Sequence, residues 1–416
     1  MPLRLEDTRS GERRTVRPRA GRPVSLYVCG PTVYDAAHVG HARTYLFFDL
    51  VRRFLSAEGT PVHHVMNITD FEDKIDRRAE ELGLRWRTLA RREEAAFFRD
   101  MGAFGILPPD DHPRASDFVL PIVRVAESLA KTGRVRREGD LWIYSPPEHS
   151  GVVNFPLETE LSRHAVEEPD HPFPRREGAL GEFVIWKRQS PPLPSWPSEF
   201  GPGSPGWHLE CYAMARRLLD IPVDLHGGGL DLIYPHHHAE NEIALALDHQ
   251  PFSRLFVHTA FVLQDGAKMS KSTGNLIPLH VALRRASPGG LRWYLLSTPY
   301  RVRLGWRTLG LDVAEREYQE LRRNLAHWLA PGAGGSLGAG TVEELARGAR
   351  ADLAEGLAAD RVIQRLRELS ARLSRDPSGR VAAGERPAAR EALRSVEERL
   401  GMPLLPSTAR SGRRRR

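Results

Sequence analysis

The stretch VSLYVCGPTVYDAAHVGHARTYLFFDLVRRFL, residues 24–55, decides how the first part of this 416-residue chain folds. An apolar run with strand character ends at Cys29 and breaks at Gly30–Pro31. HVGH, residues 38–41, then stands at the start of an apolar-periodic segment that predicts a helix. A strand, a glycine-bearing loop and a helix in this order form half of a nucleotide-binding unit, in which the helix N-terminus and the imidazoles face phosphate. The stretch therefore predicts an α/β fold.

The composition limits the class of protein. With 41% hydrophobic residues and mixed charge, the chain is long enough for two or three globular domains. The opening residues MPLRLEDTRSGERR lack the apolar core of a secretory signal, and no stretch approaches the roughly 18–20 apolar residues that span a bilayer. We therefore expect a soluble, cytoplasmic protein that makes no membrane contact.

The charge balance and the cysteine count add two further limits. A formal net charge of +7 favours a polyanionic partner, although an arginine-rich proteome would produce the same balance. Cys29 and Cys211 are the only cysteines, so no disulfide framework holds the fold together.

The segment PHHHAENE, residues 235–242, crowds metal-capable groups into one turn of a predicted helix. His236 and Glu240 are four residues apart and therefore lie on the same helical face. Cys29 and Cys211 both lie where a loop meets a regular element. Two sulfurs, one nitrogen and one oxygen would together suit zinc. The alternatives are two ordinary buried thiols and a solvated helix face.

A lysine-bearing segment, DGAKMSKSTGN, follows at residues 265–275. Lys268 and Lys271 lie there in a loop rich in glycine and polar residues, and mobile lysines can neutralise charge that develops on a triphosphate in a transition state. Alone, this segment or HVGH could be a solvated surface turn. In this order and roughly 230 residues apart, the two together are a strong signal.

HVGH followed by KMSKS resembles the class I aminoacyl-tRNA synthetases. The longer stretches resemble cysteinyl-tRNA synthetase and its relative, the cysteine ligase of mycothiol biosynthesis; they read YVCGPTVYDAAHVGHARTY, NITDFEDKI, SPGWHLECYAMA, DLHGGGLDLIYPHH and DGAKMSKSTGN. They cover the chain from about residue 20 to 310, and motifs of this length are highly specific. The resemblance implies a Rossmann-like class I synthetase catalytic core with an insertion and a C-terminal α-helical bundle.

The family's zinc site uses two cysteines, a histidine and a glutamate. It implies one Zn²⁺ per chain, held by Cys29, Cys211, His236 and Glu240. Zinc would separate cysteine from serine because it binds a thiolate much better than a hydroxyl, whereas pocket shape alone discriminates poorly between such isosteres. Because four ligands close a tetrahedral zinc, the substrate sulfur would enter as a fifth ligand or displace Glu240.

The segment around these ligands departs from the family pattern, which commonly reads PHHENE where this chain reads PHHHAENE. Counting from Pro235 without a gap keeps His236 and Glu240 in register. His238 and Glu242 have the same spacing and remain a competing pair, and His237 is expected to be a bystander.

The resemblance also assigns the other site residues. The catalytic residues would be His38, His41, Lys268 and Lys271. ATP with Mg²⁺ would be bound by Gly40, His41, His226, Gly227, Gly228, Asp231, Lys268, Met269, Ser270, Lys271 and Ser272. The amino acid L-cysteine would be bound by Cys29, Thr69 and Trp207. Plain core packing for Trp207 and a tight turn for the glycines are the alternatives.

Five segments are expected along the chain. They are the first half of the catalytic domain at 1–133, a connective insertion at 134–205, the second catalytic half with the zinc-site and KMSKS segments at 206–310, a helical bundle at 311–402 and a basic disordered tail at 403–416. Helices are expected in residues 86–104, 121–133, 312–329, 351–373 and 389–401.

The acceptor of the activated cysteine stays open. Cysteinyl-tRNA synthetases usually carry a further C-terminal domain that grips the anticodon, and we expect no room for it after about residue 402. That departure favours the mycothiol-type ligase, which joins cysteine to the amine of glucosaminyl-inositol, as do the stretches SWPSEFG, WRTLARREE and TYLFFDLV. The stretches GPTVYD, NITDFEDKI and VIWK, the retained Glu240 and the basic charge favour a tRNA acceptor.

We therefore predict a monomeric cysteine–tRNA ligase of the AMP-forming class I type, with L-cysteine, ATP and tRNA as its partners. The alternatives are the mycothiol-type ligase, a paralogue that uses another acceptor, and a non-catalytic zinc- and RNA-binding scaffold. Loss of catalysis would be expected to erase HVGH or KMSKS first, and both are intact.

Overall fold

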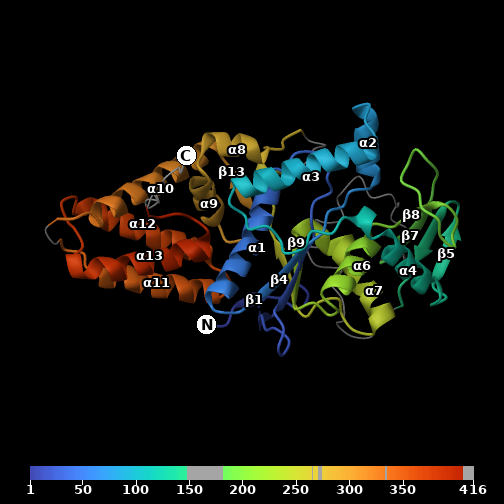
Figure 1. The fold of residues 1–416 in the computed structure, drawn as a ribbon, viewed down its shortest axis with the longest axis horizontal. Coiled ribbons are helices and arrows are strands. Elements are labelled where there is room, and N and C mark those ends of the chain that lie inside the picture. The colour runs from blue at the N-terminus through green and yellow to red at the C-terminus, as the bar shows by residue number, and fades with distance from the viewer. Residues whose placement is uncertain (148–180, 265, 270–273, 333–334, 406–416) are drawn as a thin grey trace, which may run out of the picture.

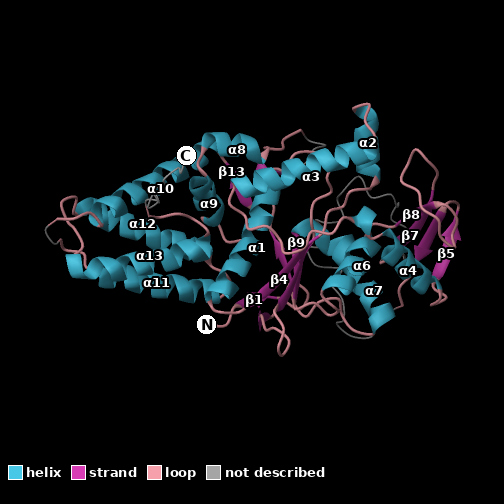
Figure 2. Cartoon of the chain, in the orientation of Figure 1, coloured by secondary structure: helices cyan, strands magenta, loops and turns pink. Residues whose placement is uncertain are grey.

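The computed structural model describes residues 1–147, 181–264, 266–269, 274–332 and 335–405. The described chain is elongated, with C-terminal helices at one end, a small antiparallel sheet at the other and a parallel sheet between them (Figure 1). Figure 2 separates the helical end from the strands of the middle and of the far end. The expected combination of an α/β core with a helical C-terminal segment is therefore confirmed.

The central sheet is parallel and buried. Its strands are β3 (Val24–Val28), β4 (Val62–Met66), β9 (Leu225–Gly229) and β10 (Phe256–Thr259), in the order β10-β9-β3-β4. All five residues of β3 are buried, as expected for a parallel strand that is covered on both faces. From β3 the chain continues to β4 on one side of that strand, whereas the later strand β9 pairs with β3 on its other side, so the order of the strands reverses at β3. Ligands bind at the carboxyl ends of strands at such a switch point.

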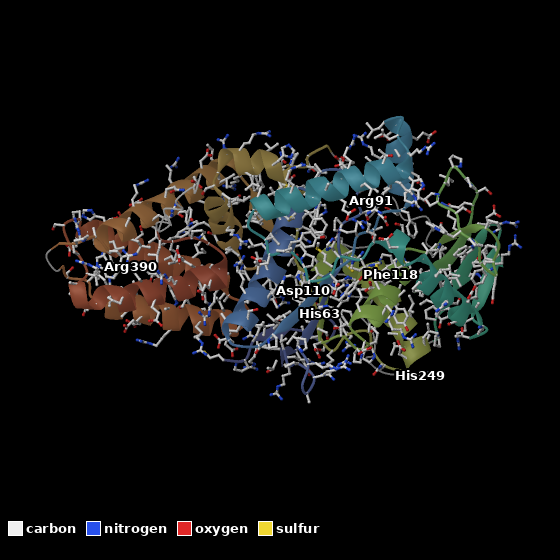
Figure 3. All side chains as sticks on the ribbon, in the orientation of Figure 1. His63, Arg91, Asp110, Phe118, His249 and Arg390 are labelled. Atoms are coloured by element: carbon white, nitrogen blue, oxygen red, sulfur yellow. The ribbon has the colours of Figure 1, made fainter. Side chains whose placement is uncertain are left out.

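The outer edge of β4 is covered by the segment that follows α3. Met66 and Ile68 donate backbone hydrogen bonds to Asp111 and Pro113, and the His64 amide donates to the Asp110 carboxylate at 2.8 Å. His63 and Asp110 mark this edge in Figure 3. The edge therefore offers no open ladder to another chain.

The helix α1 (Val39–Ala57) links the sheet to the C-terminal helices (Figure 1). His38 caps it, because its Nδ1 accepts hydrogen bonds from the amides of Gly40 at 3.1 Å and His41 at 3.3 Å. Apolar side chains such as Phe48 and Phe54 are fully buried along it. The helix is therefore fixed at its first turn by its own sequence and along its length by packing.

The remaining elements of the core surround this sheet. The helices are α2 (Asp73–Glu81), α3 (Trp86–Ala103), α4 (Val119–Ala130), α6 (His208–Leu218), α7 (His238–Asp248), α8 (Leu279–Arg285) and α9 (Pro288–Leu296). The short strands β1 (Arg4–Glu6) and β2 (Arg13–Thr15) pair antiparallel. A three-stranded sheet joins β11 (Val262–Gln264) antiparallel to β12 (Ala267–Lys268) and parallel to β13 (Leu304–Trp306). The helices expected at 86–104 and 121–133 are present as α3 and α4.

A separate antiparallel sheet lies within the segment expected to be an insertion. It has the order β5-β6-β7-β8, formed by β5 (Val135–Glu138), β6 (Leu141–Tyr144), β7 (Phe183–Arg188) and β8 (Gly203–Pro205). Residues 148–180 of this segment lie outside the described residues.

The C-terminal helices are α10 (Thr308–Trp328), α11 (Ala339–Ala354), α12 (Ala359–Arg375) and α13 (Arg386–Leu400). The prediction of one continuous helix over 351–373 is wrong, because α11 ends and α12 begins within this range. Gly356 and Leu357 both take positive φ at the break, which a continuing helix cannot accommodate. Residues 406–416, most of the expected basic tail, lie outside the described residues. Over the part of the chain that is described, no helix combines the length and the apolar character needed to cross a bilayer.

A buried ion pair joins the core to these helices. Arg292 on α9 is 1% exposed, and its Nη1 lies 2.9 Å from Asp49 Oδ2 on α1 and donates to the Leu400 carbonyl, also at 2.9 Å. Its Nη2 donates to the Gly105 carbonyl at 2.5 Å. One guanidinium thus connects α1, α9, the segment after α3 and the end of α13, which is the fork geometry that arginine provides.

We predict that Asp49→Asn destabilises the protein by about 3–5 kcal/mol, because it leaves the buried Arg292 charge without its carboxylate counter-charge. The free energy of unfolding in urea measures this loss. The control is Asp312→Asn, the same chemical change in the exposed pair Arg285–Asp312, which should have a much smaller effect. Equal losses in the two variants would show that the buried pair does not hold the core and the helices together.

Candidate functional site

The two cysteines meet at the carboxyl end of β3. Cys29 directly follows this strand, and Cys211 lies in the first turn of α6, so they reach one point from segments 182 residues apart. Both thiols are buried, and their Sγ atoms lie 3.8 Å apart. Both cysteines therefore lie where a loop meets a strand or a helix, as the sequence predicts.

His236 and Glu240 complete a four-residue group with the thiols. His236 Nε2 lies 3.1 Å from Glu240 Oε1, and Cys29 Sγ lies 3.7 Å from the same oxygen. One ligand atom from each residue of Cys29, Cys211, His236 and Glu240 lies within 4.8 Å of all the others. We call this set the thiol cluster.

The backbone before α7 departs from a regular helix. Residues Ile233–His237 form a wide π-type turn, in which Tyr234 has extended φ and ψ. His236 therefore sits in the turn and Glu240 in the first turn of α7, yet the two still face each other. A π-type turn of this kind is frequent at functional sites.

The structure corrects the expectation that His237 is a bystander. His237 Nε2 lies 3.3 Å from Cys29 Sγ, and His237 forms a second possible set with Cys29, His226 and Glu240. Two consecutive histidines, His236 and His237, therefore both reach the cluster, just after the point where Tyr234 interrupts the helical backbone. By contrast, neither His238 nor Glu242 belongs to any group of three or more metal-capable side chains among the described residues.

Within the thiol cluster, neighbouring charges favour the ionised forms of Cys211, His236 and Glu240, whereas burial favours the neutral thiol of Cys29. Burial opposes ionisation of Cys211, but its hydrogen bond with Cys29 and the charge of His236 lower its pKa to about 7. Burial would also lower the pKa of His236, but the charges of Glu240 and Cys211 raise it to about 10. The pKa of Glu240 is held well below its usual range by His236 and His226 despite burial, and burial raises the pKa of Cys29. A divalent cation that replaces the histidine proton would balance the negative ligands.

The thiol cluster fits zinc on two counts. Two thiolates, an imidazole and a carboxylate form a borderline-soft ligand set. Zinc–sulfur bonds of about 2.3 Å in a tetrahedron place two sulfurs about 3.8 Å apart, which matches the separation of the two Sγ atoms. The cluster therefore needs little rearrangement to hold the ion.

The outer partners of the cluster are also histidines, and the sequence reasoning missed one of them. His226 Nε2 lies 2.8 Å from Glu240 Oε2, and His208 Nδ1 lies 3.0 Å from His236 Nδ1. Such partners orient metal ligands. His208 lies three residues before Cys211, so a helical reading of WHLEC would have placed it on the same face.

His226 has a different environment from the one expected. Its ring is fully buried, with Nδ1 at 3.0 Å from the Tyr27 carbonyl and Nε2 at Glu240. Both ring nitrogens are therefore engaged, and neither is available to a nucleotide phosphate. Gly227 packs at the centre of the sheet, where a Cβ would lie 2.0 Å from the Val257 carbonyl oxygen, so only glycine fits. Asp231 follows in a short 3₁₀ turn, Leu230–Leu232.

Thr69 and Trp207 border the thiol cluster. The Trp207 ring stacks on His236 with centroids 4.1 Å apart and an interplanar angle of 16°. Thr69 is buried beyond the end of β4, where its amide donates to the Pro31 carbonyl at 3.2 Å. The side chains predicted to bind the amino acid thus lie on segments that meet at Cys29 and His236.

The HVGH segment lies at the same rim of the sheet. The rings of His38 and His41 stack with centroids 3.8 Å apart. Burial, followed by the charge of His38, lowers the pKa of His41 well below its ordinary value. The lowered pKa favours the neutral form of the His41 ring.

The lysine segment is described only in part. Lys268 ends β12, and the amide of Met269 donates to the Val262 carbonyl at 3.3 Å. Ser270, Lys271 and Ser272 lie outside the described residues. The backbone of Lys268 therefore lies beside β11, the strand that follows β10 in the chain.

Residues 15–316 match the family model described as the tRNA synthetases class I (C) catalytic domain. The chain belongs to this family. The sequence prediction of the family is thereby confirmed, and with it membership of a family of ligases.

Known members of the family are similar to this chain over most of its length. A cysteine–tRNA ligase of Aeropyrum pernix is 37% identical over 330 residues, which cover 77% of this chain and 67% of that protein. An L-cysteine:1D-myo-inositol 2-amino-2-deoxy-alpha-D-glucopyranoside ligase of Thermomonospora curvata is 41% identical over 321 residues, 75% and 76% of the two chains. Both acceptor types considered from the sequence thus occur among the relatives.

Solved structures of other class I synthetases share the fold. A leucyl synthetase of Agrobacterium radiobacter, solved in a ternary complex with tRNA, superposes with a TM-score of 0.65 at 11% identity and covers 92% of this chain and 84% of its own. The methionyl-tRNA synthetase of Mycobacterium tuberculosis superposes with a TM-score of 0.58 at 18% identity, covering 91% and 89%. The Rossmann-like class I core expected from the sequence is confirmed.

We predict that Glu240→Gln weakens the affinity for zinc by about 10–100-fold or more. Loss of an outer-shell partner already costs about 10–100-fold in metal sites. Glu240 is the test position because it belongs to both possible ligand sets. Chelator competition combined with elemental analysis measures the affinity.

Glu242→Gln is the matched control, since it makes the same chemical change two residues along α7 and should leave retention unchanged. A loss that follows Glu242→Gln instead would move the site to the competing pair His238 and Glu242.

Proposed function

We propose that this protein activates L-cysteine with ATP and transfers the cysteinyl group to the 3′ end of cysteine tRNA. The observation that carries the proposal is the thiol cluster at the switch point of the sheet, beside the HVGH helix. The cluster supplies a sulfur-selective site, and the helix N-terminus supplies a phosphate site. Both sites include residues that follow β3 in the chain, since Cys29 ends this strand and the HVGH helix begins after it.

The proposed chemistry has two steps. A carboxylate oxygen of cysteine attacks the α-phosphorus of ATP, the bond to pyrophosphate breaks, and cysteinyl-adenylate forms. A hydroxyl of the acceptor then attacks the carbonyl carbon, and AMP leaves. His38, His41, Lys268 and Lys271 would stabilise phosphate charge, so the catalysis is positional and electrostatic. Mg²⁺ would accompany the ATP.

Selection of cysteine would rest on the thiol cluster. Zinc, when bound there, supplies a soft Lewis acid for the substrate thiolate. Neighbouring residues hold the ligands of the thiol cluster in place. His226 Nε2 lies 2.8 Å from Glu240 Oε2, His208 Nδ1 lies 3.0 Å from His236 Nδ1, and the Trp207 ring stacks on the His236 ring. A serine hydroxyl remains protonated and is a weaker ligand, so the site rejects it without a second, editing site.

The second candidate acceptor is an amine of a glucosaminyl-inositol. It is favoured by the 41% identity to the ligase of Thermomonospora curvata, of which this chain covers 76%. Activation is the same for both acceptors, so only the transfer step separates them. In either case the reaction belongs in the cytoplasm, where both thiols stay reduced.

Cysteine-dependent exchange of labelled pyrophosphate into ATP tests the activation step. We expect exchange with cysteine and little with serine. A protein that retains its metal and shows no exchange would refute ligase activity and leave the non-catalytic scaffold.

The acceptor is tested by offering the enzyme cysteine tRNA and glucosaminyl-inositol in parallel, with ATP and cysteine present. We expect charging of the tRNA. Consumption of the aminosugar with uncharged tRNA would establish the second candidate.

We predict that Lys271→Ala lowers the rate of adenylate formation by about 100-fold, because removing one group that stabilises transition-state charge costs about 10²–10³ in rate. The KM for cysteine should stay unchanged, since the thiol cluster is intact. Single-turnover pyrophosphate release measures the rate. A variant as fast as the parent would remove Lys271 from the catalytic residues.

A further inference from the structure

The lysine segment is attached to α1 on its C-terminal side. The amide of Val39 donates to the Ile277 carbonyl at 3.0 Å, and the amide of Leu279 donates to the Ala37 carbonyl at 2.7 Å. His38 and Pro278 accordingly form an antiparallel bridge. The chain that leaves the lysine segment is therefore bonded to the two residues on either side of His38.

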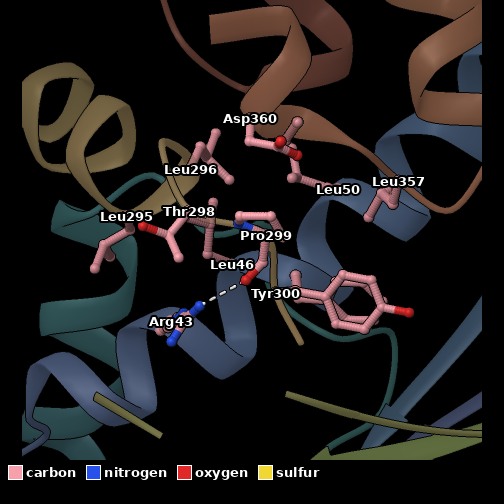
Figure 4. Close-up of a pocket in the computed structure, with 12 residues that line it drawn as sticks. Arg43, Leu46, Leu50, Leu295, Leu296, Thr298, Pro299, Tyr300, Leu357 and Asp360 are labelled. Carbon is pink, nitrogen blue, oxygen red and sulfur yellow. Dashed lines mark hydrogen bonds between the residues drawn. The ribbon is translucent and has the colours of Figure 1, made fainter. Parts of the chain in front are cut away.

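The approach to the lysine segment is attached to the same helix by Arg43. Its Nη1 donates to the carbonyls of Ala260 at 3.2 Å and Phe261 at 3.0 Å, which lie between β10 and β11. Its Nη2 donates to the carbonyls of Pro299 at 2.9 Å and Val302 at 2.5 Å, which lie before β13. Figure 4 shows Arg43 turned from α1 toward Pro299. One guanidinium thus ties together both segments that feed the three-stranded sheet.

These two segments form one unit with β12. The amide of Ala260 donates to the Tyr300 carbonyl at 2.8 Å, and the amide of Leu304 donates to the Phe261 carbonyl at 3.0 Å. β11 pairs with β13 on one side and with β12, which ends at Lys268, on the other. A shift of this unit relative to α1 would therefore move Lys268 relative to His38 and His41.

The environment of Arg43 is unusual for a buried charge. The residue is 4% exposed, and within the described ranges it has no carboxylate at ion-pair distance, so its partners are backbone carbonyls. An apolar side chain would fill this space without the desolvation cost of a charge. A guanidinium is the side chain whose fixed fork can hold four carbonyl oxygens at set positions.

We propose that Arg43 is a positioning residue that sets the place of β12, the strand that ends at Lys268, relative to the HVGH histidines during ATP activation. It lies two residues after His41, and its hydrogen bonds go to the segments that lead into β11 and β13, so it acts through the backbone of β12. This inference rests on the proposed function, and it adds that both phosphate-binding groups are mounted on one helix.

A packing role is the alternative, because Arg43 also lines a small cavity between α1, the segment 298–300 and the turn between α11 and α12 (Figure 4). None of the histidines or thiols of the sites described above lines this cavity. The two roles differ in what they change: packing affects stability, whereas positioning affects the rate of activation at a given fraction of folded protein.

The test is Arg43→Lys, which keeps the charge but cannot reach four carbonyls. We expect single-turnover adenylate formation to slow by about 10–100-fold, because small misplacements of catalytic groups cost up to about 10²-fold. The KM for cysteine and the zinc content should stay at the parent values. If Arg43→Lys does not fold, Arg43→Gln is used in its place, because it removes the buried charge.

Arg53→Lys is the matched control. Arg53 lies on the same helix and also donates to a carbonyl, that of Gly105 at 3.0 Å, but its hydrogen bonds go to Asp49 and the segment after α3 and not to the segments that lead into β11 and β13. Its replacement should lower stability without slowing activation. Equal slowing in both variants, or a stability loss alone in Arg43→Lys, would overturn the proposal.

A double-mutant cycle with Lys268→Ala tests whether Arg43 acts through the lysine segment. If it does, Arg43→Lys should slow the Lys268→Ala enzyme by less than about 2-fold, because coupled residues are not additive. A full further loss in that background would show that Arg43 acts elsewhere. Lack of pyrophosphate exchange in the parent enzyme would instead refute the proposed function itself, so the two failures are distinguishable.

Discussion

The parallel pairing of β3 with β9 is the constraint on which the rest of the structure depends. It places Cys29 at the end of one strand beside the glycines that end the next, at the point where the chain order reverses across the sheet. Gly227 lets the strands pack closely behind this rim, because a Cβ there would meet the Val257 carbonyl and the Phe48 ring. Cys211, His236 and Glu240 then reach Cys29 from α6 and α7, and the HVGH helix starts from the same edge.

Helix α1 distributes that geometry through the molecule. Its first turns carry HVGH and are bonded to the chain on both sides of the lysine segment, through the bridge at His38 and through Arg43. Its later turns meet the C-terminal helices through Asp49 and Arg292. Two buried arginines therefore fix one helix against separate parts of the chain: Arg43 does so through backbone carbonyls, and Arg292 does so through the Asp49 carboxylate.

The sequence was sufficient for the core and for much of the site. Strand β3, the helix after HVGH and the meeting of Cys29, Cys211, His236 and Glu240 follow from local patterns and from long, specific motifs. The sequence could not show the π-type turn before α7, because three consecutive histidines look alike until the backbone fixes their directions. Nor could it show the break at Gly356–Leu357, where a helical pattern runs on across two residues with positive φ. The role of Arg43 depends on carbonyls more than 200 residues away, which no local pattern reports.

The two possible ligand sets share Cys29 and Glu240, and this overlap offers one ion two alternative coordination arrangements. An ion that loses His236 keeps an imidazole alternative in His226 and His237. Bound-metal content alone is therefore an insensitive reporter of damage at this site, and the coordination spectrum of a substituted ion is the sensitive one.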